Sequence, residues 1–387
     1  MTPSHAERCA RLRLLRAADV GDLRLLEHVR ERGAEEMVGL LRAGSRASAA
    51  SAEVVARLDA VDPESEIAAG HALGARFVIP GDAEWPNRLH DLARITVTPR
   101  KGGVPLGLWV RGPLGLDELE HSLSIVGTRA ATPYGTSVAA EIAATCASVG
   151  LVVVSGAAFG VDYAAHRGAV TVGGHTVAVL ACGVDKHYPV QHEEMLEHLA
   201  RTSAVVSEAP LGAHCQRQRF LARNRIIVAL TQGTVVVEAA LRSGALNSAE
   251  WADKLMRPAM GVPGPVTSGV SSGVNDYVRN GKLTLVTRGE EVLEQVSPMG
   301  VALLAQRRGE ERAYDALDED QQKVFEVLPA RDALDLVSIA REALMDRDDA
   351  AFILGELARG EWVINEGDDA NGPWRITSPG VADRAAS

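Results

Sequence analysis

Short apolar runs separated by glycine-bearing polar turns recur through residues 124–264. Stretches with apolar positions at helical spacing lie between them. This alternation of strand, turn and helix predicts an α/β fold in which crossover helices cover a mostly parallel, doubly wound sheet. In such sheets ligands bind beyond the carboxyl ends of the strands. The turns at those ends are therefore where we expect a functional site.

The core is predicted to contain six strands and five helices. The strands are 123–127, 151–155, 176–181, 203–207, 233–237 and 258–262, and the helices are 134–149, 160–172, 191–200, 221–230 and 243–255. A short strand at 283–287 and a helix at 289–296 close the core. Two earlier apolar runs, 77–80 and 106–112, predict further strands that extend the sheet.

The regions that flank the core have other patterns. Apolar positions at helical spacing over 7–58 predict three or four helices, followed by a connector at 59–75. Near the C-terminus, three helices and two strands predict a winged-helix-like module. The predicted domains are a helical (SAM-like) domain at 1–60, an extended Rossmann-like core at 70–298, a linker at 299–313 and the winged-helix-like domain at 314–380.

Composition excludes several classes of protein. No stretch approaches eighteen uninterrupted apolar residues, so we expect no membrane span. The polar N-terminus has no apolar signal core, which predicts a cytoplasmic location. Cysteines stand at 9, 146, 182 and 215 without CxxC spacing, which argues against a zinc site or a disulfide framework. We predict neither a metal ion nor a cofactor.

Charge is unevenly distributed along the chain. Residues 310–387 hold 19 Asp and Glu against 8 Lys and Arg, whereas residues 1–309 hold 32 of each. The net charge of −11 therefore belongs to the C-terminal segment. It does not argue against an anionic ligand for the rest of the chain.

The turns that end the predicted strands carry groups that suit a phosphate. The chain has neither G-x-G-x-x-G nor the P-loop motif, but free N–H groups at helix starts attract phosphate without either. Glycines allow close approach of a ligand, hydroxyls can donate hydrogen bonds, and a guanidinium can bind two phosphate oxygens. The candidates are Gly127, Thr128, Arg129, Ser155, Gly156, Gly160, Ser243 and Gly244.

A second signal is the arginine-rich stretch 216–225. It lies within a longer segment, 209–237, that contains no Asp or Glu. Arginines interleaved with an aromatic residue, here Phe220, suit single-stranded nucleic acid, which needs charge for its backbone and a surface on which bases stack. The same arginines could instead pair with carboxylates of the core or of an interface. The candidates are Arg217, Arg219, Arg223, Asn224 and Arg225.

Three residues are of types that often act in catalysis. Asp162 and His166 are four apart and could form an acid–base pair, although a helix-terminal carboxylate with a structural histidine is the favoured interpretation. Glu238 ends a strand and could act as a base, but structural or binding use is favoured. No Ser/His/Asp arrangement and no metal-ligand cluster stands out.

A series of motifs resembles the DprA/Smf family of DNA-processing proteins in order and spacing across the whole core. The motifs are Ile125-Val126-Gly127-Thr128-Arg129, Tyr134-Gly135, the segment 154–162, Ala165-His166-Arg167-Gly168-Ala169, Val177-Ala178-Val179-Leu180, Gly183-Val184-Asp185, Tyr188-Pro189, Ser207-Glu208-Ala209-Pro210, Arg223-Asn224-Arg225-Ile226-Ile227, Val236-Val237-Glu238-Ala239, Ser243-Gly244-Ala245 and Val262-Pro263-Gly264.

The resemblance implies a protein that binds single-stranded DNA in a basic pocket of an extended Rossmann domain. It also implies a homodimer that delivers the strand to the RecA recombinase during DNA uptake or recombination. Many family members carry Arg or Lys where Phe159 stands and Pro where Leu221 stands. These departures imply a phosphate contact that is lost or replaced by stacking, and a change in the local turn. By motif, the pocket roles fall on Arg129, Ser155, Gly156, Gly160, Arg223, Asn224 and Arg225.

The sequence also has features of two other classes of function. Residues 232–238 loosely resemble the P-G-G-x-G-T-x-x-E motif of LOG-type nucleotide phosphoribohydrolases, but the paired prolyl-glycine donors are missing. A transcription regulator would rest on the winged-helix pattern alone, in a segment that is strongly acidic. We therefore predict a binding protein and no enzyme.

Overall fold

The computed structural model describes residues 2–18, 20–43, 52–95, 102–297, 313–329, 331–367 and 371–377. Contacts divide the chain into two units, 1–304 and 305–387. The first unit contains a nine-stranded sheet with the order β1-β2-β6-β5-β4-β3-β7-β8-β9. Its strands are β1 (Ala75–Val78), β2 (Leu108–Arg111), β3 (Ser122–Gly127), β4 (Val152–Ser155), β5 (Thr176–Leu180), β6 (Ala204–Ser207), β7 (Gly233–Val237), β8 (Ala259–Val262) and β9 (Thr284–Leu285).

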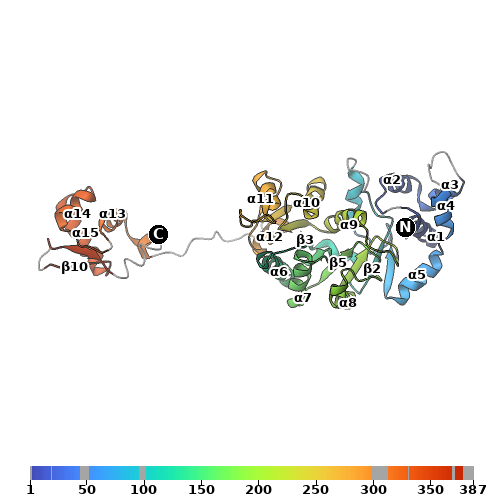
Figure 1. The fold of residues 1–387 in the computed structure, drawn as a ribbon, viewed down its shortest axis with the longest axis horizontal. Helices are drawn as coiled ribbons and strands as arrows, with labels where there is room; N and C mark the ends of the chain where they lie inside the picture. The colour runs from blue at the N-terminus through green and yellow to red at the C-terminus, as the bar shows by residue number, and fades with distance from the viewer. Residues whose placement is uncertain are drawn as a thin grey trace. The chain divides into compact units, whose positions relative to one another are not determined.

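The sheet is parallel from β3 to β9 and antiparallel where β1 and β2 extend it beyond β6. The expected α/β, mostly parallel, doubly wound sheet is therefore confirmed. Helices cover both of its faces (Figure 1). On one face lie α6 (Pro133–Ser148), α7 (Val161–Thr171), α8 (Glu193–Thr202) and α12 (Gly289–Val296), and on the other lie α9 (Arg217–Leu230), α10 (Gly244–Lys254) and α11 (Ser272–Arg279).

Burial on both faces explains why the central strands read as continuous apolar runs. In β7, Val235 and Val237 pack on the side of α6 and α7, whereas Val236 packs on the side of α9 and α10. All three side chains are fully buried. Each crossover returns the chain to the same edge, so the turns after β3, β4 and β7 lie together at the carboxyl ends of the strands.

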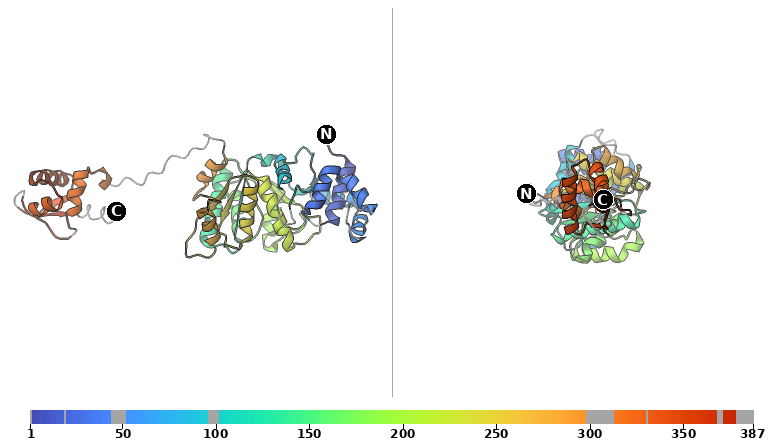
Figure 2. Two further views of the ribbon diagram at one scale, coloured as in Figure 1. Left: turned by 90° about the horizontal axis from the view of Figure 1, so that it is seen from above. Right: turned by 90° about the vertical axis from the view of Figure 1, so that its left-hand side faces the viewer.

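Five helices pack at the end of the sheet where β1 lies (Figure 2). They are α1 (His5–Ala17), α2 (Leu23–Arg32), α3 (Ala34–Arg42), α4 (Ala52–Asp59) and α5 (Pro63–Ala72). The fifth helix corrects the prediction of a connector at 59–75. Its start is well specified, because Pro63 occupies the first turn and the Asp62 carboxylate accepts a hydrogen bond from the Ser65 N–H.

Leu211, in the loop after β6, joins these helices to the sheet through its backbone. Its N–H donates to a carboxylate oxygen of Glu66 at 3.2 Å, and its carbonyl accepts from the Arg16 guanidinium at 2.8 Å. Arg16 and Glu66 are themselves paired at 2.7 Å. The three residues form a closed set of contacts between α1, α5 and a loop far away in the sequence.

Helix α9 begins at Arg217, four residues before the predicted start at 221. Its first turn lacks a side-chain cap, and its outer residues are long polar side chains that favour helix. As a result Arg223 and Arg225 lie inside the helix and not at its start.

The second unit contains α13 (Glu319–Val327), α14 (Leu336–Glu342), α15 (Arg347–Arg359) and the antiparallel strands β10 (Val363–Asn365) and β11 (Trp374–Ile376). Phe325 is fully buried at the centre of its core, and Leu334 forms a β-bridge with Trp374. Three helices and two strands were predicted in this order, and the winged-helix assignment stays a prediction. The predicted linker at 299–313 lies outside the described residues except for Ala313, and residues 378–380 of the predicted domain also lie outside them.

Among the described residues, no helix is both long and apolar enough to cross a membrane.

Candidate functional site

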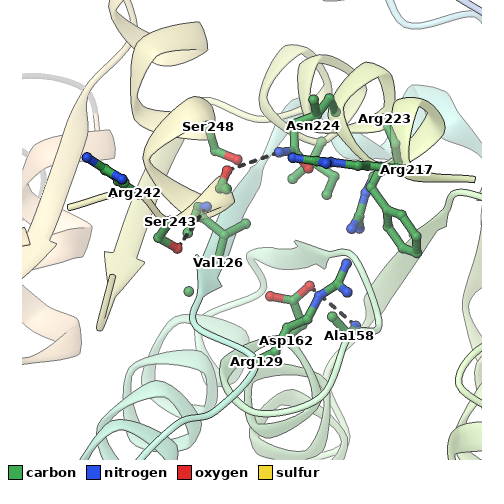
Figure 3. Close-up of a pocket in the computed structure, with 16 residues that line it drawn as sticks. Val126, Arg129, Ala158, Asp162, Arg217, Arg223, Asn224, Arg242, Ser243 and Ser248 are labelled. Carbon is green, nitrogen blue, oxygen red and sulfur yellow. Dashed lines mark hydrogen bonds between the residues drawn. The ribbon is translucent and has the colours of Figure 1, made fainter. Parts of the chain in front are cut away.

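A pocket of about 570 Å³ opens at the carboxyl end of β3, between the turn that follows this strand and helices α9 and α10 (Figure 3). Val126 and Gly127 form part of its wall. Arg129 and Asp162 lie on one side, Arg217 and Asn224 of α9 on another, and Ser243 lies at the start of α10. The prediction of a site at this edge of the sheet therefore corresponds to a formed cavity.

Among the described residues, four guanidinium groups and one carboxylate, that of Asp162, line the pocket. Arg129 and Arg242 come from two different turns, and Arg217 and Arg223 come from α9. The side chains of Arg217 and Arg242 are exposed, and their guanidinium groups have no hydrogen-bonding partner within the described part of the chain. Arg129 lies over the Phe220 ring, with its guanidinium carbon 4.5 Å from the ring centroid. The pocket therefore presents uncompensated positive charge.

Arg223 lies at the bottom of the pocket and is only 6% exposed. One Nη donates to the Val179 carbonyl at 3.0 Å, while the buried Nε has no hydrogen-bonding partner among the described residues. Burial lowers the pKa of the Arg223 guanidinium. A buried donor without a partner is costly, so an anion that accepts from Nε would stabilise this arrangement.

Gly156 was predicted to allow close approach of a ligand, and the structure shows that it allows close approach of Arg223. A Cβ at position 156 would lie 1.3 Å from an Nη atom of Arg223. The absence of a side chain at 156 is therefore what lets the guanidinium lie against the β4–α7 turn. Gly156 contributes to the site by positioning an arginine.

Gly160 has a similar indirect role. Its φ of +76° is a conformation that residues with a Cβ rarely adopt, and a Cβ here would lie 2.4 Å from the Thr128 carbonyl. This close packing brings the start of α7 against the turn that carries Arg129.

Asp162, in the first turn of α7, is buried and shares the pocket with the arginines. Its carboxylate accepts from the Ala158 N–H at 3.4 Å. Burial raises the pKa of the Asp162 carboxyl, although the nearby Arg223 charge acts in the opposite direction. The carboxylate therefore offsets part of the positive charge around the pocket and leaves most of it.

Arg225 is not part of the pocket, which corrects the prediction from the arginine-rich stretch. Its side chain is fully buried, and two Nη atoms pair with the Glu208 carboxylate at 2.7 Å each. Its Nε donates to the carbonyls of Gly102 and Gly103. Residues two apart on a helix point about 200° apart, so Arg223 and Arg225 cannot face the same cavity. The alternative that an arginine pairs with a core carboxylate holds for Arg225.

Ser155, Thr128 and Arg219 also lie outside the pocket lining. The Ser155 hydroxyl is fully buried and donates to the Ile125 carbonyl at 2.6 Å, so it joins β3 to β4. The Thr128 hydroxyl accepts from the Ala130 N–H within its own turn. The Arg219 guanidinium donates to the His214 carbonyl at 2.7 Å. The Ser155 hydroxyl is engaged inside the sheet, so its predicted contact with a ligand stays a prediction.

Asn224, Ser243 and Gly244 do line the pocket, and they also fix its geometry. The Asn224 amide donates to the Gly244 carbonyl at 3.3 Å, which joins α9 to the start of α10. The Ser243 hydroxyl caps α10 by accepting from the Ala245 N–H. Two walls of the cavity are thereby held together by polar contacts.

The three candidate catalytic residues, Asp162, His166 and Glu238, form structural contacts. The Glu238 carboxylate accepts from the N–H of Thr132 at 2.9 Å and from its hydroxyl, which positions the start of α6. His166 is fully buried, its Nδ1 lies 2.7 Å from the Thr176 hydroxyl, and burial lowers its pKa to about 3. Asp162 and His166 thus have separate partners.

Aromatic side chains gather beside the pocket. Phe159 is 44% exposed and meets the His192 ring edge-on at 4.8 Å, while the Tyr188 and Phe220 rings lie 5.7 Å apart. Phe220 and Leu221 line the pocket itself, whereas Phe159 does not. Phe159 supplies an exposed ring next to His192.

Sequence reasoning missed Arg242 and Ser248, which both line the pocket. Arg242 directly precedes Ser243-Gly244, so a search for charge beside the predicted turn would have found it. Ser248 lies one turn further along α10 and has no comparable signal in the sequence.

The fold and the pocket together define a doubly wound α/β protein with an arginine-lined pocket at the carboxyl ends of its strands. The sequence model of the family DNA recombination-mediator protein A matches residues 76–297, which include the whole pocket. The chain belongs to this DprA/Smf family.

Similar proteins agree with this assignment. The chain is 41% identical over 320 residues to a Mycobacterium tuberculosis protein named as a DNA processing protein DprA, which covers 81% of this chain and 80% of that protein. It is 38% identical to Protein Smf of Escherichia coli over 57% of this chain and 56% of that protein. The crystal structure of DprA from Streptococcus pneumoniae superimposes with a TM-score of 0.63 at 27% identity, covering 77% of this chain and all of that one.

Proposed function

We propose that the first unit binds single-stranded DNA, without sequence preference, in the pocket between β3, α9 and α10. The observation that carries this proposal is made on the described residues: four arginines and one carboxylate, Asp162, line one cavity, and the buried Nε of Arg223 has no partner among them. Guanidinium groups bind phosphate oxygens through charge-assisted hydrogen bonds. Family membership supports DNA as the phosphate-bearing ligand.

The shape of the pocket favours a single strand over a duplex. Its volume of about 570 Å³ is that of a small-molecule site, so it can admit part of one strand but not a double helix. Arg223 lies at the bottom and Arg217 at the surface, so a ligand must bend inward to reach both. The half-buried Phe220 lines the pocket and the exposed Tyr188 lies next to Phe220, so unpaired bases could stack there.

The test is fluorescence anisotropy of the full chain with a labelled oligothymidine and with a duplex of equal length, at several salt concentrations. We expect the single strand to bind at least tenfold more tightly. The logarithm of its binding constant should fall with the logarithm of salt concentration with a slope of about −0.7 for each phosphate neutralised. Equal affinity for the duplex, or an affinity independent of salt, would contradict the proposal.

We also propose that the protein acts in the cytoplasm as a homodimer that delivers the bound strand to the RecA recombinase during DNA uptake or recombination. Family membership supports this extension. Light scattering tests the dimer, and assembly of RecA on a strand coated with single-strand-binding protein tests delivery. A monomer at micromolar concentration, or RecA assembly that does not respond to the protein, would limit the function to strand binding.

The second unit should not carry the main affinity for DNA. Residues 310–387 hold 19 acidic against 8 basic residues, and repulsion from the phosphates acts over about 8–10 Å at ordinary salt. We therefore expect a protein truncated after Gln306 to bind single strands as tightly as the full chain or more tightly. Anisotropy at two salt concentrations measures this, with circular dichroism as a check on folding. A tenfold loss in a folded truncation would show that the second unit contributes to DNA binding.

A further inference from the structure

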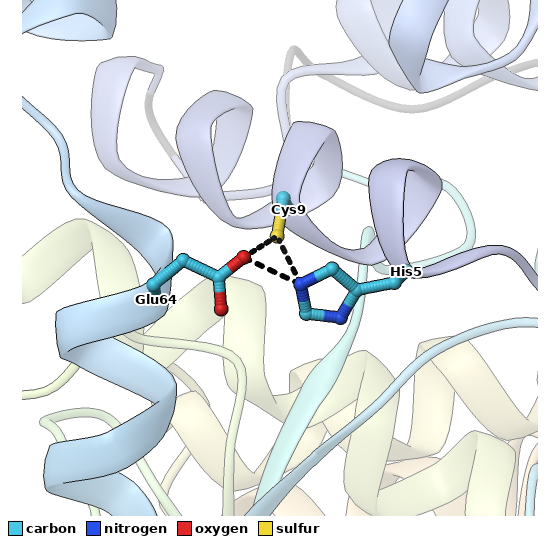
Figure 4. Close-up of side chains that lie close together, drawn as sticks. All are labelled: His5, Cys9 and Glu64. Carbon is cyan, nitrogen blue, oxygen red and sulfur yellow. Dashed lines mark hydrogen bonds and ion pairs between the residues drawn. The ribbon is translucent and has the colours of Figure 1, made fainter.

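Three potential metal ligands meet on the surface of the N-terminal helices, outside the pocket described above. His5 and Cys9 lie one turn apart on α1, and Glu64 lies in the first turn of α5. Their side chains point toward one another (Figure 4). One nitrogen, one sulfur and one oxygen atom from these residues all lie within 4.8 Å of each other. This mixed donor set is one that Zn²⁺ accepts, whereas Mg²⁺ and Ca²⁺ prefer oxygen alone.

The distances between the donor atoms fit a tetrahedral ion. With Zn–S of about 2.3 Å and Zn–N and Zn–O of about 2.0 Å, tetrahedral angles place sulfur about 3.5 Å from each of the other two donors. In the structure the Cys9 Sγ lies 3.5 Å from the His5 Nε2 and 3.6 Å from the Glu64 Oε1. Only the contact between Nε2 and Oε1, now 2.5 Å, would have to open, to about 3.3 Å.

We propose that His5, Cys9 and Glu64 form a binding site for Zn²⁺, with water as the fourth ligand. The His5 and Glu64 side chains are 64% and 65% exposed, so an ion can enter without movement of the helices and a solvent position stays open. A bound ion would join α1 to α5. The proposal departs from the sequence expectation of no metal, which rested on the absence of CxxC spacing and could not anticipate that α5 brings Glu64 to α1.

The positive charges nearest to the site are engaged elsewhere. The Arg8 guanidinium forms two hydrogen bonds with the Asp82 carboxylate, at 2.8 and 2.6 Å. The Arg13 guanidinium donates to the carbonyls of Leu58 and Val61. Neither arginine forms an ion pair with Glu64. The Glu64 carboxylate pairs with His5 and remains available to an ion.

The experiment uses the full chain, treated with a chelator and then freed of it. Zn²⁺ is titrated in competition with a chromophoric chelator, and Co²⁺ is used as a spectroscopic substitute. We expect one equivalent of Zn²⁺ with a micromolar or lower Kd. The Co²⁺ form should show a thiolate-to-metal charge-transfer band and the visible absorption of a tetrahedral ion.

Variants assign the ligands. Cys9→Ser and Glu64→Gln should each weaken Zn²⁺ binding at least about a hundredfold, since even loss of an outer partner commonly costs ten- to hundredfold. Cys9→Ser should also abolish the charge-transfer band. The matched controls are Cys215→Ser, which removes another partly accessible thiol, and His28→Ala, which removes another exposed imidazole. Both controls should bind the ion as the unaltered chain does.

Three results would overturn the proposal. The first is no stoichiometric binding at 100 µM Zn²⁺, a concentration on the order of a hundred times the expected Kd and so enough to saturate the site. The others are a charge-transfer band that persists in Cys9→Ser and a band that is lost in Cys215→Ser. If Cys9→Ser does not fold by circular dichroism, His5→Ala and Glu64→Gln test the same site. The single-strand binding measurements are independent, so failure of the DNA proposal leaves this one unaffected.

Discussion

Replacing Arg225 with alanine should lower the free energy of unfolding of the first unit by about 3–5 kcal/mol, the typical cost of breaking a buried ion pair. The guanidinium is fully buried and pairs at two points with Glu208, which is 4% exposed. Alanine would leave that carboxylate buried without its partner and would free the Gly102 and Gly103 carbonyls. Urea denaturation followed by circular dichroism measures the effect.

Two further variants separate this effect from a loss of charge. Arg217→Ala removes an exposed arginine of the same helix and should change stability by less than about 0.5 kcal/mol. The double variant Arg225→Met with Glu208→Leu should be more stable than Arg225→Ala, because no unpaired charge remains buried. An Arg225→Ala protein with an unchanged urea midpoint but weakened DNA binding would contradict this structural role and would show that Arg225 contributes to DNA binding.

Replacing the three more accessible pocket arginines together, in Arg129→Ala, Arg217→Ala and Arg242→Ala, should weaken single-strand binding at least a hundredfold. A hydrogen bond to a charged group contributes about 1.5–3 kcal/mol, so losses that add over three positions exceed the roughly 2.8 kcal/mol that a hundredfold change requires. The salt slope should become shallower by about 2, because about 0.7 is lost for each phosphate contact. Anisotropy across a salt series gives both quantities.

A matched triple variant tests whether position or mere charge matters. Arg24, Arg201 and Arg279 are exposed on the same unit and do not line the pocket. Their replacement by alanine removes the same charge and should reduce affinity only a few-fold. If both triple variants lose affinity equally, binding depends on the net charge of the unit and the pocket is not the site.

The sheet could be predicted because its central strands are buried on both faces and are apolar throughout, as in β7. The edge that holds the site followed from the topology, since parallel strands with crossover helices bring their turns together. The family was identified from the motifs in those turns. These features depend on local pattern and on the order of elements, both of which are visible in a sequence.

The roles of individual residues were less accessible. Whether Arg223 or Arg225 faces the cavity depends on how α9 is rotated against the sheet, and in the structure Arg225 points toward Glu208. That glutamate stands just outside the acid-free segment, so the segment gave no sign of it. The role of Gly156 depends on a guanidinium 67 positions later in the chain. Such contacts are set by packing between elements, which no local pattern records.

The contacts around Leu211 have a consequence for synthesis of the chain. The Arg16 guanidinium binds a carbonyl 195 residues later, and Glu66 binds the N–H of the same residue 145 positions later. At about 5–20 residues per second, the ribosome needs on the order of 10–40 s to bridge the first of these intervals. During that time α1 and α5 emerge without the loop against which they pack. The Arg16 guanidinium and the Glu66 carboxylate therefore lack these two backbone partners until Leu211 has left the exit tunnel.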